Sequence, residues 1–321
     1  MIPVVAVIFV IVVGGALVYW LYRVVAAEAP QVPPGEDLEE PDKPDAAIEP
    51  KAPPTPDGLA YIFCHEYAGP VPETKATSRR SRCVAPMTGE EVEARDVAAQ
   101  ILFAQLAELY MDGSVDLEVR ASDPGLMPPF PHKCWEMYVR KRRDFPRTPV
   151  ADKMANVFLE RSTVSRGPAR TRDDAICVSE LVEKTVAAMR RDTSFWRRAG
   201  VYADVRNFVE AHMLERGYLI SGDGQTFLER VKGVVPKLNE GSLQTLRDAF
   251  AALEARLEQF EERHGVKGES TADDNPYGIH MPLVEGAVEA DEVPLCEGLR
   301  ISVIEALVAL RQMEPSDDIG I

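Results

Sequence analysis

Motifs of the common catalytic classes are missing from this sequence of 321 residues. It contains no G-x-x-x-x-G-K-S/T, no G-x-G-x-x-G after a strand, no H-E-x-x-H and no G-x-S-x-G. The turn at residues 221–224 lacks the alternating oxygen ligands and the terminal glutamate of a calcium-binding loop. We therefore expect no enzyme and no cofactor, although an active site assembled from scattered residues would leave no such motif.

Paired cysteines are missing as well. The five cysteines are widely spaced and none forms a C-x-x-C pair, which favours reduced thiols in a cytoplasmic body over a disulfide framework. Sulfur and imidazole suit tetrahedral zinc, so the weak candidates for a metal site are Cys64, His65, Cys83, His132 and Cys134. Free thiols and surface histidines explain these residues equally well. A nucleophile–base pair at Cys64-His65 is disfavoured, because adjacent strand residues point to opposite faces.

An excess of positive charge is missing too, since the formal net charge is −16. Nucleic-acid binding needs a basic face that displaces counterions, so nucleic acid is an unlikely partner class.

Charged side chains are absent between Ile2 and Tyr22. Those positions span roughly 31 Å as a helix, close to one hydrocarbon core, and we predict a transmembrane anchor over residues 1–27. The predicted interface residues are Tyr19, Trp20, Tyr22 and Arg23, and the small pair Gly14 and Gly15 is a candidate docking face for another helix. No basic residue precedes the run and Arg23 follows it, which predicts that the bulk of the chain is cytoplasmic. A cleaved signal is the alternative, but the run is long and has no positive n-region.

An acidic, proline-rich segment follows at residues 28–57. It contains nine prolines and nine acidic residues against Lys43 and Lys51. Such a composition predicts an extended linker without a packed core.

The body, residues 58–321, reads as mainly α-helical with minor short strands. We predict an α+β subdomain at 58–165 and a mainly helical subdomain at 166–321. Predicted strands lie at 59–63, 115–120 and 218–220, and predicted helices at 88–112, 135–143, from 148, 173–191, 194–217, 242–264 and 295–313. The helix–turn–strand passages at 88–120 and 194–220 resemble, in a generic way, the helix-to-wing passage of winged-helix modules.

Two patterns in the body predict contacts. A heptad seam of apolar residues alternates spacings of three and four along the helix at 242–264, through Leu243, Leu246, Phe250, Leu253, Leu257 and Phe260. The seam fits a helical hairpin within the chain or a contact between chains. A basic cluster runs from Lys133 to Arg147 beside Trp135 and Tyr138, and its candidate contact residues are Arg140, Lys141, Arg142 and Arg143. It is a solvated helix face, a contact for an acidic partner, or a contact for anionic lipid.

The leading functional hypothesis is a non-catalytic, membrane-anchored accessory or assembly subunit of a multi-subunit membrane complex. An energy-transducing complex, photosynthetic or respiratory, is the candidate class of assembly. Its partners would be the other subunits and the bilayer, and its mechanism would be local concentration and docking. The alternatives are a membrane-tethered regulator with winged-helix-like binding modules, and an enzyme whose site leaves no motif.

Overall fold

The computed structural model describes residues 49–71, 82–121, 135–164, 174–192, 200–220, 236–265 and 293–314. All of them belong to one compact unit that spans residues 47–321. The predicted anchor at 1–27, with Gly14, Gly15, Tyr19, Trp20, Tyr22 and Arg23, lies outside the described residues, as does the linker up to residue 48.

The fold class needs a correction. Within the described ranges no helix combines the length and the apolar character that a membrane crossing requires. The longest of these helices, α8 (Leu243–His264), has 22 residues and carries eight Asp, Glu and Arg side chains between Arg247 and Arg263. The prediction of a single transmembrane helix, and with it the single-pass membrane localisation, is therefore not supported. What the structure describes is a mainly helical fold with small sheets.

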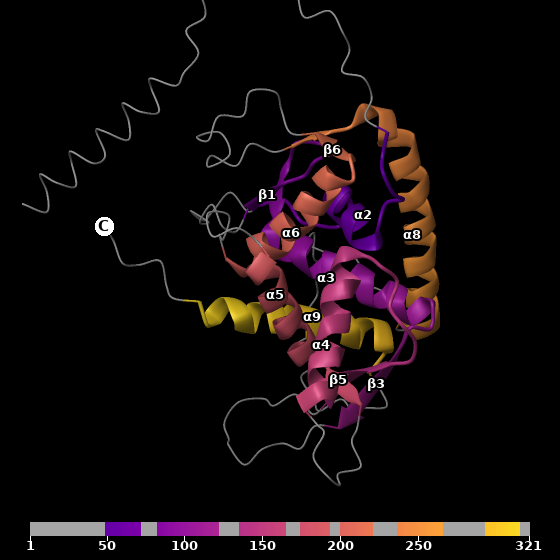
Figure 1. Cartoon of the computed structure of the whole chain (residues 1–321), viewed down its shortest axis with the longest axis vertical. Coiled ribbons are helices and arrows are strands. Elements are labelled where there is room, and N and C mark those ends of the chain that lie inside the picture. Colours follow the sequence, from indigo (N-terminus) through magenta and orange to yellow (C-terminus); the bar gives the residue numbers. More distant parts are fainter. Residues whose placement is uncertain are drawn as a thin grey trace, which may run out of the picture. The chain divides into compact units, whose positions relative to one another are not determined.

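Helix α3 (Ala94–Met111) is the centre of the fold, and its side chains are buried on nearly every side. It packs against α2 (Pro56–Ile62), α6 (Val201–Glu215), α8 and α9 (Leu295–Gln312), as Figure 1 shows. Several alanines along α3 allow these neighbours to approach closely. Helices α4 (Pro149–Val164) and α5 (Val178–Asp192) pack on each other, and α5 also contacts α6 and α9. Both predicted subdomains thus contribute to one core.

Within the described ranges, three antiparallel sheets accompany the helices. The largest is three-stranded, in the order β3 (Val115–Ala121), β4 (Trp135–Lys141) and β5 (Ala175–Cys177), and it packs on α5 and α9. The others pair β1 (Arg82–Val84) with β2 (Glu91–Glu93), and β6 (Leu219–Ile220) with β7 (Lys237–Leu238). Short 3₁₀ turns, η1 (Cys64–Glu66) and η4 (Glu240–Ser242), follow α2 and precede α8.

Several predicted elements are confirmed. Strand β3 covers 115–120, α4 begins at the predicted Pro149, and α8 and α9 match the helices predicted at 242–264 and 295–313. Helix α6 ends at Glu215 and is closed by the expected glycine, Gly217, whose φ of 82° is left-handed, and the Tyr218 amide donates to the Met213 carbonyl at 3.0 Å.

Other elements were predicted wrongly. Residues 59–63 fall largely in helix α2, which begins with Pro56, instead of forming a strand. Residues 135–141 form strand β4, because Trp135, Met137 and Val139 alternate with half-buried residues and face the core with period two. The helix predicted from residue 88 begins only at Ala94, and the one predicted from 173 begins at Val178, because short strands precede both.

The winged-helix resemblance also needs correction. The passages from α3 to β3 and from α6 to β6 exist. The first leads into the three-stranded sheet, whereas the second leads to a pair of two-residue strands. The two passages are therefore not copies of one module.

Candidate functional site

A cleft of about 510 Å³ opens between the segment at residues 66–70 and helices α3, α8 and α9. This volume is within the range of ligand-binding pockets. Five carboxylates line it and come from three different parts of the chain: Glu66, Asp96, Glu254, Glu258 and Glu261. Arg300 of α9 is the basic side chain among the described lining residues. The cleft therefore combines a concave shape with an excess of negative charge.

The floor of the cleft is aromatic and aliphatic. Phe250 of α8 is 7% exposed and stacks on Phe63, with ring centroids 4.1 Å apart and planes 10° from parallel. Phe103 of α3 lies under the Arg300 guanidinium, 4.9 Å from ring centroid to carbon. Leu257 and Ile304 add aliphatic surface. An apolar side chain can therefore lie on the same floor that the carboxylates surround.

Helix α8 serves both the core and the cleft, because adjacent stripes of the helix face different neighbours. Its seam packs within the chain, against α2, α3 and α9, with Leu246, Leu253 and Phe260 buried. Leu243 and Leu257 lie half-buried along the same stripe. The adjacent stripe places Glu254, Glu258 and Glu261 on the cleft.

The carboxylates of the cleft repel one another. Burial raises the pKa of Glu254, and the neighbouring charges of Glu66 and Glu258 raise it further. Glu261 is compensated, since its Oε1 lies 2.5 Å from Arg300 Nη2. A cationic ligand group between Glu66, Glu254 and Glu258 would relieve their mutual repulsion.

Two of the residues predicted as metal ligands meet beside the cleft. Cys64 in η1 and Cys83 in β1 are both buried and lie close enough to shift each other's pKa, while the Cys83 thiol donates to the Val84 carbonyl at 3.7 Å. His65 instead contacts Glu66, with Nε2 and Oε1 3.2 Å apart. His132 and Cys134 lie outside the described residues. In the described part of the chain, no three or more His, Cys, Asp or Glu side chains are grouped so that they could hold a metal ion.

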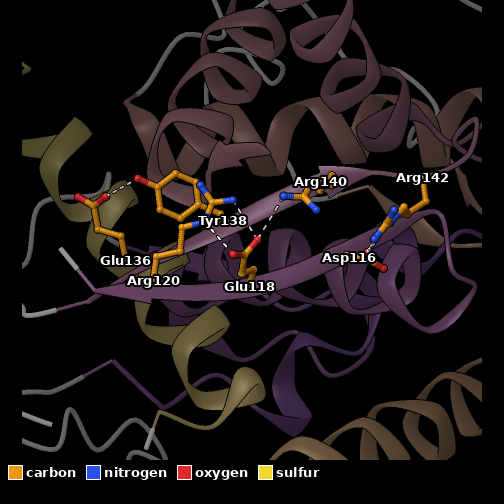
Figure 2. A network of polar contacts seen from close by, with 7 residues as sticks. All are labelled: Asp116, Glu118, Arg120, Glu136, Tyr138, Arg140 and Arg142. Carbon is orange, nitrogen blue, oxygen red and sulfur yellow. Dashed lines mark hydrogen bonds and ion pairs between the residues drawn. The ribbon is translucent and has the colours of Figure 1, made fainter. Parts of the chain in front are cut away.

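Arg140 and Arg142 of the predicted basic cluster lie at the part of the sheet shown in Figure 2, where strand β3 supplies acidic neighbours. Arg140 lies 3.5 Å from Glu118, which also pairs with Arg120 at 2.9 Å, and Arg142 pairs with Asp116. Figure 2 also shows Tyr138, whose hydroxyl donates to Glu136 at 2.8 Å while Arg120 lies over its ring.

The other two residues of the cluster differ. Lys141 pairs with Asp144 at 2.9 Å, three residues further along the chain, whereas for Arg143 it is the backbone amide that donates, to the Ser114 carbonyl at 3.2 Å. The positive charges of Arg140, Lys141 and Arg142 thus have acidic neighbours. Contact with a partner or with lipid at this face stays a prediction.

No known protein family, curated protein or solved structure matches this chain. The site itself is therefore the basis for a functional proposal. Sequence reasoning found Phe250 and Leu257 through the heptad seam but missed the acidic side of the cleft. The sequence signal for this acidic side was the spacing of Glu254, Glu258 and Glu261 along α8. That spacing is equally typical of a solvent-exposed helix face.

Proposed function

We propose that this chain is a non-catalytic accessory subunit of a multi-protein complex, which binds a basic segment of a partner protein in its acidic cleft. The observation that carries the proposal is the convergence of Glu66, Glu254 and Glu258 over an aromatic floor. Lysine or arginine side chains of the partner would meet these carboxylates, and a large apolar side chain between them would lie on Phe250. Because carboxylates and apolar side chains line the same cleft, it should prefer a segment that carries both basic and apolar side chains.

The expected strength of this contact follows from its parts. Partly exposed ion pairs contribute about 0.2–1 kcal/mol each, and burial of one large apolar side chain contributes about 1.5–3 kcal/mol. Three ion pairs and one such side chain therefore give about 2–6 kcal/mol before the costs of association. A short peptide would bind only weakly. Strong assembly needs further contacts on the same partner, which is typical of a subunit held by several surfaces at once.

The experiment compares matched charge reversals in the full chain. Glu254→Lys with Glu258→Lys alters the cleft, whereas Glu183→Lys with Glu215→Lys makes the same change in net charge at exposed positions of α5 and α6. The probe is a fluorescein-labelled peptide of alternating arginine and leucine, with an alternating glutamate and leucine peptide as its counterpart. Fluorescence anisotropy measures both affinities.

We expect the cleft variant to lose at least tenfold in affinity for the basic peptide, and the α5–α6 variant to stay within threefold of the unmodified chain. The acidic peptide should not bind. Equal losses in the two variants would show that net charge alone governs binding, and would overturn the proposal.

A further inference from the structure

One guanidinium of the chain itself lies in the cleft. The guanidinium carbon of Arg300 is 4.9 Å from the centre of the Phe103 ring, and its Nη2 lies 2.5 Å from Glu261 Oε1. These three residues line the cleft and come from α9, α3 and α8. The planar cation is thus held by a ring on one side and by a carboxylate on another, an arrangement that suits arginine better than lysine. Arg300 shows which kind of cation this cleft accommodates.

The cleft contains a second group of aromatic rings, towards the N-terminus of α8. Phe250 stacks on Phe63, and the Tyr67 ring lies 6.2 Å from the Phe250 ring at an angle of 40°. The Tyr67 hydroxyl donates to the Ala60 carbonyl at 3.2 Å, which fixes the tyrosine against α2. Tyr67 and Phe250 both line the cleft. Contacts with the core therefore hold two further rings in place at the cleft wall.

Carboxylates accompany these two rings. Glu66, Glu254 and Glu258 line the same cleft. Glu254 and Glu258 are four residues apart on α8, so they lie on one face of the helix with Cβ atoms about 5–6 Å apart. Within the described ranges neither of these two is paired with a lysine or an arginine, whereas Glu261 is paired with Arg300. The combination of ring and carboxylate thus occurs twice, and the chain supplies its own guanidinium to one of the two.

On the basis of the proposed function, we propose that the second combination is an arginine subsite, formed by Tyr67, Phe250, Glu254 and Glu258, which prefers an arginine of the partner to a lysine. The flat guanidinium can lie against a ring while its N–H donors, spread in one plane, reach two carboxylates at once. An ammonium group can also pair with a carboxylate, but it is more strongly hydrated and has no planar face to stack. Carboxylates alone would not separate the two side chains, so the rings carry the preference.

Other cations fit the arginine subsite less well. A trimethylated lysine has no N–H donor, so it would leave the carboxylates without hydrogen bonds. A metal ion is disfavoured, because no three or more His, Cys, Asp or Glu side chains of the described residues are grouped so that they could hold one. A guanidinium satisfies both the rings and the carboxylates.

The experiment compares two labelled peptides of equal length and equal charge on the full chain. One alternates arginine with leucine and the other alternates lysine with leucine, and fluorescence anisotropy at a single ionic strength measures both affinities. We expect the arginine peptide to bind at least fivefold more tightly. The measured quantity is the ratio of the two dissociation constants, so a general attraction of positive charge to the acidic chain cancels.

Ring variants locate the preference. Tyr67→Leu should bring the ratio within twofold of one, and Phe250→Leu, which removes the other ring, should act in the same direction. Tyr67→Phe keeps the ring and should keep the ratio. Tyr202→Leu is the matched control, because Tyr202 of α6 is a half-buried tyrosine like Tyr67 but is not among the described residues that line the cleft, and it should leave the ratio unchanged. Circular dichroism confirms that each variant is folded.

The possible results separate this preference from the proposed function. A ratio within twofold of one in the unmodified chain refutes the arginine subsite, whatever the variants do. A ratio that stays at its unmodified value in Tyr67→Leu and Phe250→Leu also refutes it. In both cases the proposed function survives if the two peptides still lose affinity in the chain with Glu254→Lys and Glu258→Lys. If neither peptide binds the unmodified chain, the proposed function fails and the arginine subsite fails with it.

Discussion

Phe250 belongs both to the apolar seam of α8 and to the floor of the cleft. Removal of its side chain therefore tests how α8 packs against the rest of the fold. The ring is 7% exposed and stacks on Phe63 of the segment after α2. Substitution of a buried phenylalanine by alanine costs about 3–5 kcal/mol, since the lost transfer free energy is joined by the cost of a cavity. We expect Phe250→Ala to lower the free energy of unfolding by that amount, measured by urea denaturation monitored by circular dichroism.

A double-mutant cycle isolates the stacking contribution. Phe63→Ala, Phe250→Ala and the double variant should show a coupling energy of about 0.5–1.5 kcal/mol, the range of buried aromatic pairs. Gln259→Ala, at an exposed position of the same helix, is the control and should change the free energy of unfolding by less than about 0.5 kcal/mol. If Phe250→Ala does not fold, Phe250→Leu gives a smaller loss in the same direction.

A loss below about 1 kcal/mol for Phe250→Ala would refute the packing of α8 on α2. A stability that rises with protein concentration would instead favour a seam between chains, the alternative that the heptad spacing left open.

Two further predictions concern single residues. Asp57 is fully buried, and burial raises its pKa above the usual value of 3.8 in the folded state. The Asp57 carboxyl therefore keeps its proton up to a higher pH in the folded chain than in the unfolded chain. For this reason the free energy of unfolding falls as the pH rises through the folded-state pKa. Asp57→Asn should raise the free energy of unfolding at pH 7, and this advantage should shrink as the pH falls towards 4, in urea titrations at several pH values. Gly217→Ala should lower the free energy of unfolding by about 1 kcal/mol, because a φ of 82° is strained for a residue with Cβ, and Gly217→Asn should lose less.

The fold was predictable where the signal is local. The seam of α8 follows from the spacing of six apolar residues, and the end of α6 follows from Gly217. Short elements were harder. The apolar run after Pro56 fits a strand or a buried helix equally well, and only its packing on α3 decides for the helix. In β4, the aromatic Tyr138 lies between the core residues Met137 and Val139. Three large apolar or aromatic side chains in a row hide the alternation with period two that marks a strand.

The candidate site was predictable only in part, because it is assembled by tertiary contacts. Glu66 is the last residue of η1, Asp96 lies in the first turn of α3 and Glu254 belongs to α8, so no window of sequence contains them together. The same holds for Cys64 of η1 and Cys83 of β1, which belong to separate elements. Sequence alone placed both cysteines among weak metal candidates, but it could not show that both side chains are buried.

The location of a bound basic segment tests the central claim most directly. An arginine–leucine peptide carrying a photoreactive benzophenone can be irradiated with the full chain, and the crosslinked residues identified by mass spectrometry. The account predicts crosslinks concentrated in residues 66–70, on the cleft side of α3 and at Phe250 to Glu261 of α8. The account would be contradicted by crosslinks spread over the acidic surface, with crosslinking at Glu183 of α5 and Glu215 of α6 as frequent as at Glu254.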